Sequence, residues 1–291
     1  MAAQTLLLRL PPGYRVDEVL AFHARDAEGV AEQVNGQTLR KAVLLGGVPV
    51  LFAVDFVDGE ARCSVEADGE LDAATRALAD EALRSMLALR IDPAPFAEFV
   101  RGDAFFRPLV ARLPGLRIVQ SATVFEALTW AIIGQQINLP FAISLRRSFI
   151  GQAGRPHSSG LWCYPEAADV ARLELDTLTS RKFSRAKAET LLRVARMAND
   201  GELDLRLNHD PPRSAAQLLA IKGVGPWTVN YTLLRGYGYA DCSLEGDVAV
   251  RSAIGRALGM AEKPSIAQAQ GWLAAYAPQR TMAAAYLWAS L

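Results

Sequence analysis

The sequence predicts an α+β fold in which an N-terminal antiparallel sheet layer with helices precedes an all-helical body. Two observations carry this prediction. Strand-like runs separated by turn residues are confined to about the first 90 positions, and helical apolar periodicity replaces them from Asp92 onward. A chain of 291 residues, 51% of them hydrophobic, is also long enough to bury a sizeable core in two or three subdomains. We therefore expect an α+β domain over 1–91 and a helical body over 92–291.

Turn residues separate the elements of the N-terminal layer. Pro11-Pro12-Gly13, Gly46-Gly47 and Asp58-Gly59 interrupt runs rich in β-branched and aliphatic residues. The predicted strands are 5–10, 37–45, 48–56 and 61–66, and the predicted helices are 16–25 and 71–89.

Gly, Pro and Asn separate the helices of the body. The long apolar segment 124–133 indicates a helix that is buried on most sides. The predicted helices are 96–101, 105–113, 124–150, 167–173, 184–199, 214–220, 226–236, 247–258, 265–276 and 281–291.

Bulk composition restricts the classes of function. Lys and Arg total 31, as do Asp and Glu, so any DNA binding must depend on a local patch or on backbone amides. Cys63, Cys163 and Cys242 form no CxxC, which excludes a four-cysteine iron–sulfur loop and suits a reducing compartment. Without a membrane span or signal segment, we expect a soluble, cytoplasmic protein.

The segment 218–247 has the most informative pattern in the chain. Apolar residues end at Gly223-Val224-Gly225, and a second helix begins at Pro226, where proline loses nothing by lacking an N–H. Glycines permit a tight turn and a close approach to another molecule. The free N–H groups of the second helix would bind an anion, and a nucleic-acid phosphate suits a helical hairpin. The alternative is a plain link between two packed helices.

Asp247 follows Gly225 by 22 positions and precedes a further apolar-periodic segment. Together, the hairpin at about 214–236 and this aspartate resemble the AlkA-type helix-hairpin-helix DNA glycosylases. Further resemblance lies in LAFHAR, FEALTWAIIGQQI, SRAKAETL and APQRTMAAAYLW, so it covers nearly the whole chain. It implies a TBP-like N-terminal layer, an active-site cleft between two helical subdomains, and a monomer, nucleoid-associated, that acts on damaged double-stranded DNA.

The resemblance makes Asp247 the catalytic residue. Breaking a glycosidic C–N bond leaves positive charge on the sugar, and a fixed carboxylate can stabilise that charge and orient a water. A helix N-cap, worth ~1 kcal/mol, is the plainer role for this aspartate, and the two roles are compatible. No required cofactor is expected.

Trp227 occupies the position where strand-nicking relatives carry a lysine nucleophile. An indole cannot form a Schiff base, so the resemblance implies a monofunctional enzyme without lyase activity. It also implies that Trp227, Tyr231, Trp288 and Phe22 line a pocket for the flipped base. Stacking on aromatic faces favours cationic bases such as 3-methyladenine and 7-methylguanine by ~1–2 kcal/mol. Core packing is the alternative for these rings.

Two turns are expected to contact DNA. The family inserts a side chain into the duplex from the turn at Gln135-Gln136, where Gln136 replaces the usual aliphatic residue and Leu139 lies nearby. The other expected DNA contacts are Lys222, Gly223, Val224, Gly225 and Arg185, the last from a basic run that is otherwise a solvated helix face.

Relatives hold a monovalent cation at the hairpin. Here the main-chain carbonyls of Leu219, Ile221 and Val224 would bind structural Na⁺ or K⁺, because an all-oxygen site does not suit a transition metal. The resemblance therefore indicates base-excision repair of alkylated bases. The rival functions are excision of deaminated or oxidised bases, and damage binding without catalysis.

Overall fold

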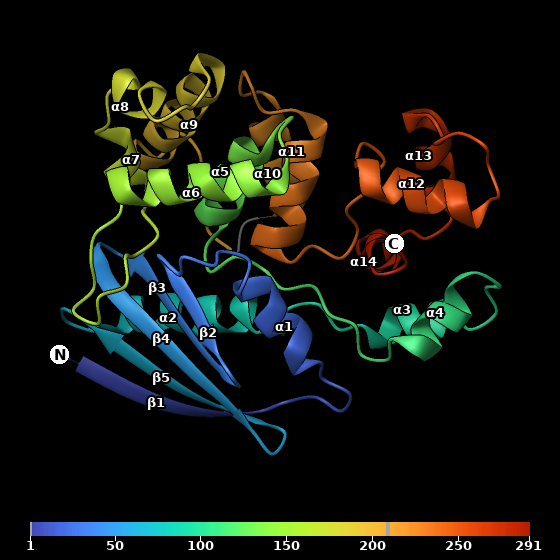
Figure 1. The fold of residues 1–291 in the computed structure, drawn as a ribbon, viewed down its shortest axis with the longest axis horizontal. Coiled ribbons are helices and arrows are strands. Elements are labelled where there is room, and N and C mark those ends of the chain that lie inside the picture. Colours follow the sequence, from blue (N-terminus) through green and yellow to red (C-terminus); the bar gives the residue numbers. More distant parts are fainter. Residues whose placement is uncertain (1, 208–209) are drawn as a thin grey trace.

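The computed structural model describes residues 2–207 and 210–291. A sheet layer lies against a central group of helices, and a second helical group stands to one side (Figure 1). Across the described ranges, no helix combines the length and apolar character needed to span a membrane.

The described strands form a five-stranded antiparallel sheet in the order β1-β5-β4-β3-β2. Positive φ angles at Gly46, Gly47, Asp58 and Gly59 form the two predicted hairpin turns. The edge strand β2 was not predicted, because its residues EQVN include a single apolar side chain. The strands are β1 (Ala2–Arg9), β2 (Glu32–Asn35), β3 (Thr38–Leu45), β4 (Val48–Val57) and β5 (Glu60–Ala67).

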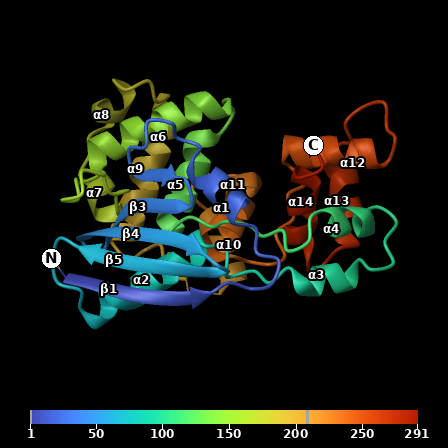
Figure 2. The same cartoon turned by 60° about the horizontal axis from the view of Figure 1, so that its bottom comes forward.

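Helix α2 (Ala73–Met86) covers one face of the sheet, and α1 (Val16–His23) lies near its edge (Figure 2). The opposite face contacts the body, where Leu161 and Cys163 pack against β3 and β4. Tyr164 also extends the sheet edge beside β3: its N–H donates to Ala42 O at 3.1 Å, and its carbonyl accepts from Leu44 N at 3.0 Å. The sheet layer and the body therefore share backbone hydrogen bonds.

The body helices follow the predicted order with shifted ends; the predicted helices 124–150 and 226–236 each divide into two elements, and α8 was not predicted. They are α3 (Ala94–Phe99), α4 (Phe106–Arg112), α5 (Val124–Gly134), α6 (Leu139–Ala153), α7 (Ala167–Ala171), α8 (Leu175–Thr179), α9 (Arg185–Asn199), α10 (Pro211–Leu219), α11 (Pro226–Thr232), the π-helix η1 (Leu233–Tyr237), α12 (Val248–Ala257), α13 (Ile266–Ala274) and α14 (Arg280–Trp288).

The single helix predicted over 124–150 is wrong, because the chain breaks between α5 and α6. Gln136 adopts φ 55°, a left-handed conformation that a helix cannot contain. Asn138 then begins α6 as its N-cap, and its side chain accepts the Phe141 N–H at 2.9 Å. An exposed turn therefore separates the buried helix α5 from the partly buried helix α6.

The helices α3 and α4 leave the rest of the body and join α12–α14 in the second group (Figure 1). Aromatic residues form the core of this group: the ring centroids of Phe96 and Tyr286 are 5.4 Å apart, and those of Phe106 and Tyr276 are 4.8 Å apart. Segments from near residue 100 and from the C-terminus thus fold together.

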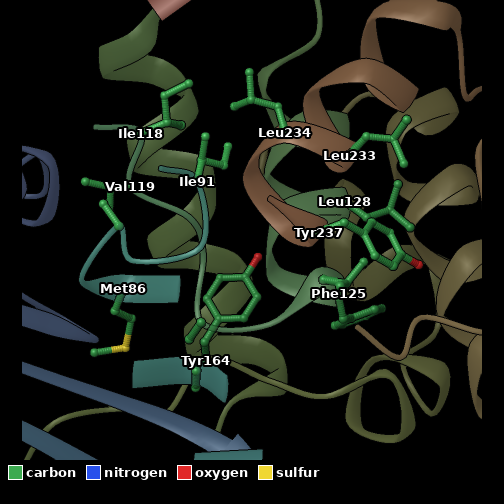
Figure 3. Packing of buried hydrophobic residues seen from close by; sticks show 14 of the residues in the cluster. Met86, Ile91, Ile118, Val119, Phe125, Leu128, Tyr164, Leu233, Leu234 and Tyr237 are labelled. Atoms are coloured by element: carbon green, nitrogen blue, oxygen red, sulfur yellow. The ribbon is translucent and has the colours of Figure 1, made fainter. Parts of the chain in front are cut away.

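The sheet layer and the central helices share one hydrophobic core. Figure 3 shows Met86 of α2 near Ile118 and Val119, with Phe125 of α5 and Leu233 of η1 in the same cluster. These residues come from both predicted domains, so apolar packing continues across the boundary at residue 91.

A buried ion network joins the two parts. Lys41 of β3 contacts Glu32 at 3.0 Å and Glu126 of α5 at 2.8 Å, and Arg146 of α6 contacts the same two carboxylates at 3.2 and 3.0 Å. The His23 Nδ1 lies 3.0 Å from Glu32. Burial by itself opposes ionisation, but the Lys41 and Arg146 charges hold the pKa of Glu32 well below its usual range. Removing one of these four charged side chains would leave the buried cluster with one charge uncompensated.

Candidate active site and DNA-binding turns

The predicted hairpin is present between α10 and α11. Gly223 has φ 96°, and Gly225 is the N-cap residue of α11, with Pro226 in its first turn. Lys222 and Gly223 are exposed, whereas Val224 is buried. The turn therefore presents backbone and a lysine to the outside while one apolar side chain anchors it.

The two glycines of this turn have different roles. A Cβ on Gly223 would lie 2.1 Å from Thr190 Oγ1 of α9, whereas a Cβ on Gly225 would meet nothing within 4 Å. Gly223 is therefore required by the protein's own packing and by its positive φ. Gly225 leaves open space in front of the helix N-terminus.

We expect Gly225→Ala to weaken binding to undamaged duplex about tenfold, or ~1.4 kcal/mol, because a methyl group would occupy the space that a phosphate needs. Gly151→Ala, at another open glycine in α6, is the control and should leave this affinity unchanged. Fluorescence anisotropy with plain duplex measures this affinity. Unchanged affinity in the folded Gly225→Ala protein would mean that the hairpin does not face DNA.

Gln135 joins the second predicted DNA-binding turn to the hairpin. Its Nε2 donates to the Gly223 carbonyl at 3.1 Å and to Thr228 Oγ1 at 2.9 Å. This amide group is therefore engaged inside the protein, and Gln135 positions the turn. Gln136 is exposed and Leu139 is 51% exposed, so both remain free to contact a ligand.

The basic run on α9 is divided between structural and exposed residues. Lys187 donates to the Ile133 carbonyl at 2.8 Å, and Arg193 donates to the Lys222 carbonyl at 2.8 Å, so both brace the turns from inside. Burial lowers the pKa of Lys187. Arg185 is exposed and pairs with Glu189 at 2.8 Å. Of the residues named here, Arg185 remains the one available to a ligand.

Asp247 is the N-cap of α12 and also the centre of a polar cluster. Its Oδ1 accepts the Val250 N–H at 2.9 Å and the Trp288 indole N–H at 3.1 Å. Its Oδ2 accepts the Trp227 indole N–H at 3.2 Å. Three donors from α11, α12 and α14 thus fix the orientation of one half-buried carboxylate. Such fixed orientation is what electrostatic stabilisation of a developing positive charge requires.

The aromatic residues predicted beside Asp247 lie in this cluster. The rings of Trp227 and Tyr231 are 5.2 Å apart with an interplanar angle of 33°. Trp130 of α5 donates its indole N–H to the Tyr231 hydroxyl at 2.9 Å. Helices α5, α11, α12 and α14 therefore contribute to one group of side chains.

Phe22 joins this group through two arginines. The Arg25 guanidinium lies 3.6 Å from the centroid of the Phe22 ring, and the Arg235 guanidinium lies 4.8 Å from it. Arg235 also lies 5.6 Å from the centroid of Trp288. Phe22 and Trp288 were expected to be free for a cationic base, but the protein's own cations already contact both rings.

Three members of this group were not predicted: Arg25, Trp130 and Arg235. The sequence holds a signal for Arg235, which follows Tyr231 by four positions and therefore lies on the same helical face. Trp130 lies within the segment FEALTWAIIGQQI and Arg25 within LAFHAR, but the group each one contacts exists only in the folded chain.

Comparison with known proteins gives the same fold. Residues 5–122 match the AlkA N-terminal domain family. The DNA-3-methyladenine glycosylase of Bacillus subtilis (strain 168) is 25% identical over 269 residues, covering 89% of this chain and 88% of that protein.

Two solved structures cover nearly the whole chain. The 3-methyladenine DNA-glycosylase from Archaeoglobus fulgidus has a TM-score of 0.82 at 22% identity, covering 98% of this chain and 97% of that one. The 8-oxoguanine glycosylase/lyase of Clostridium acetobutylicum, in complex with double-stranded DNA, has a TM-score of 0.75 at 13% identity, covering 99% and 96%. These findings show that residues 5–122 match the AlkA N-terminal domain family and that the whole chain shares the fold of these two DNA glycosylases.

Proposed function

We propose that the protein is a monofunctional DNA glycosylase that acts as a monomer on damaged double-stranded DNA and releases alkylated bases. The observation that carries the proposal is the carboxylate of Asp247, held by Trp227, Trp288 and the Val250 N–H beside a helical hairpin. A purely DNA-binding protein has no need of a fixed carboxylate near phosphates. The name of the Bacillus subtilis relative, DNA-3-methyladenine glycosylase, points to the same substrate.

The mechanism follows from this geometry. The flipped nucleotide brings its sugar to Asp247 while its base lies against Trp227 and Tyr231. As the glycosidic bond breaks, positive charge develops on the sugar and the carboxylate stabilises it. Water then adds to the sugar carbon, and an abasic site remains.

Strand cleavage would need an amine nucleophile near the sugar. The residue in the position of the lyase lysine is Trp227, and Lys222 lies exposed on the outer turn of the hairpin. We therefore propose that the protein lacks lyase activity, unlike the Clostridium acetobutylicum glycosylase/lyase that shares its fold.

The hairpin turn is also the proposed site of a structural Na⁺ or K⁺. Among the described residues, no cluster of His, Cys, Asp and Glu side chains could hold a metal ion. The proposed donors are the main-chain carbonyls of Leu219, Ile221 and Val224, which flank the turn in the sequence; that of Ile221 also accepts the Val224 N–H at 3.0 Å. Leu219 ends α10, where carbonyls lack helical partners.

Incubation with dimethyl-sulfate-treated duplex DNA tests the proposed reaction. We expect release of free 3-methyladenine and 7-methylguanine, with the strand intact until alkali is added, and no covalent adduct after borohydride reduction. Release from this DNA in the presence of the protein should exceed spontaneous release from the same DNA without it about 100-fold or more, in keeping with catalysed excision. Binding without release would identify a damage-binding protein, and borohydride trapping would reveal an amine nucleophile.

A further inference from the structure

Arg235 is a half-buried cation, and no ion pair joins it to a carboxylate of the described residues. Its Nη1 donates to the Val119 carbonyl, and its Nε is buried without a hydrogen-bond partner. Arg25 likewise forms no ion pair with an acidic side chain across the described ranges of the chain. A buried donor that lacks a partner is unfavourable, so a ligand that satisfied it would gain binding energy.

The position of Arg235 places this donor in the group around Asp247. Its guanidinium contacts the rings of Phe22 and Trp288, and Trp288 itself donates to Asp247. Burial lowers the pKa of Arg235; the Tyr231 hydroxyl opposes this shift, and the neighbouring Arg25 charge adds to it. An electron-rich ligand would relieve both the missing hydrogen bond and the repulsion between the two cations.

The charge balance of the group bears on which bases it accepts. Arg25 and Arg235 contribute two positive charges near Phe22, and Asp247 contributes one negative charge. A cationic alkylpurine placed against Phe22 or Trp288 would meet like charge. An uncharged base with a lone pair on oxygen or nitrogen would instead accept a hydrogen bond from the free Nε.

We propose that Arg235 is a specificity-determining residue that donates a hydrogen bond to uncharged damaged bases and assists their departure. The inference rests on the proposed function. An uncharged base leaves with the electron pair of the broken bond, so negative charge develops on the base. Arg235 stabilises this charge through its N–H without losing its proton. Water supplies the oxygen that adds to the sugar carbon, and the proton released from that water ends on the base.

The test compares two lesions in one duplex sequence, hypoxanthine as the uncharged base and 7-methylguanine as the cationic base. Single-turnover excision rates are measured for wild type, Arg235→Met and Arg235→Lys. Arg25→Met, which removes the other guanidinium on Phe22, is the matched control. Melting temperature and affinity for abasic-analogue duplex are recorded for each protein.

We expect Arg235→Met to slow hypoxanthine excision about 10- to 100-fold, as for loss of a hydrogen bond from a charged donor. Excision of 7-methylguanine should change less than about threefold or rise, because a repulsive charge is removed. Arg235→Lys keeps the positive charge but lacks the Nε donor, so it should also slow hypoxanthine excision. This second variant tests the proposal even if Arg235→Met does not fold.

Other outcomes would overturn the inference. Equal losses on both lesions would make Arg235 a packing residue. Weaker binding of abasic-analogue duplex by Arg235→Met would assign the guanidinium to a phosphate. A larger loss of hypoxanthine excision in Arg25→Met than in Arg235→Met would assign the selectivity to Arg25. Release of neither base by the wild type would instead reject the proposed function.

Discussion

Asp247→Asn is expected to lower the single-turnover rate of 7-methylguanine excision by about 10²–10⁴-fold, the range for loss of a positioned catalytic carboxylate. Affinity for duplex containing an abasic analogue should remain within about twofold, because the hairpin that grips DNA is unchanged. Quantifying free base over time gives the rate, and anisotropy gives the affinity.

Asparagine separates the charge of Asp247 from its capping role. Asn is as good an N-cap as Asp, so the Val250 N–H keeps an acceptor and α12 keeps its start. Asn has one acceptor oxygen fewer than Asp, so the Trp227 indole N–H would lose its hydrogen-bond partner. Asp72→Asn, at the N-cap of α2, is the matched control and should retain full activity. Substantial excision by a folded Asp247→Asn protein would remove the carboxylate from the mechanism.

Local patterns were sufficient to predict the hairpin and the cap at Asp247. Gly223 and Gly225 followed by Pro226 form a turn and a helix start through backbone conformation alone, and Asp247 precedes its helix directly. The strands β3, β4 and β5 followed from alternation and turn glycines for the same reason. In each case the determining residues are neighbours in the chain.

The features that were missed depend on residues distant in sequence. Gln135 was predicted to contact DNA, but in the folded chain its amide donates to the Gly223 carbonyl and to Thr228. The break of the predicted helix at 135–138 depends on a left-handed Gln136, which an apolar pattern does not report. The cations on Phe22 are Arg25, which follows α1, and Arg235 of η1, and the two are more than 200 positions apart.

The buried network of Lys41, Glu32, Glu126 and Arg146 was also outside the reach of sequence patterns, because each member lies in a segment that reads as ordinary strand or helix. His23 of α1 contacts Glu32, and Glu126 belongs to α5, so the network links these two helices. Both helices contribute a side chain to the site, Phe22 from α1 and Trp130 from α5. The network therefore helps to hold these two side chains in the group around Asp247.

Trp227→Ala is expected to slow 7-methylguanine excision about 100-fold, because it removes two interactions at once. A stacking surface for a base is worth ~1–3 kcal/mol in single-strand binders, and a hydrogen bond to a charged group is worth ~1.5–3 kcal/mol. Trp162→Ala, at an indole that is 37% exposed and pairs through its backbone with Val30, is the control and should leave the rate unchanged.

Trp227→Phe separates the loss of the hydrogen bond from the loss of the stacking surface. It keeps an aromatic face and removes the N–H that holds Asp247 Oδ2, so its loss should be about tenfold and equal for charged and uncharged bases. Trp227→Ala should cost the cationic base about tenfold more than hypoxanthine. No guanidinium of the described residues contacts the Trp227 ring, so no cation of the protein competes with the base for charge–π stacking there.

Trp227→Ala and Arg235→Met therefore shift the ratio of the two excision rates in opposite directions. The aromatic substitution should favour hypoxanthine over 7-methylguanine, and the arginine substitution should favour 7-methylguanine. Measured on one duplex sequence, the two ratios are independent of protein concentration and of general loss of stability. If Trp227→Ala lowers both rates equally, Trp227 acts on Asp247 alone, and the rings of the site do not select for charge.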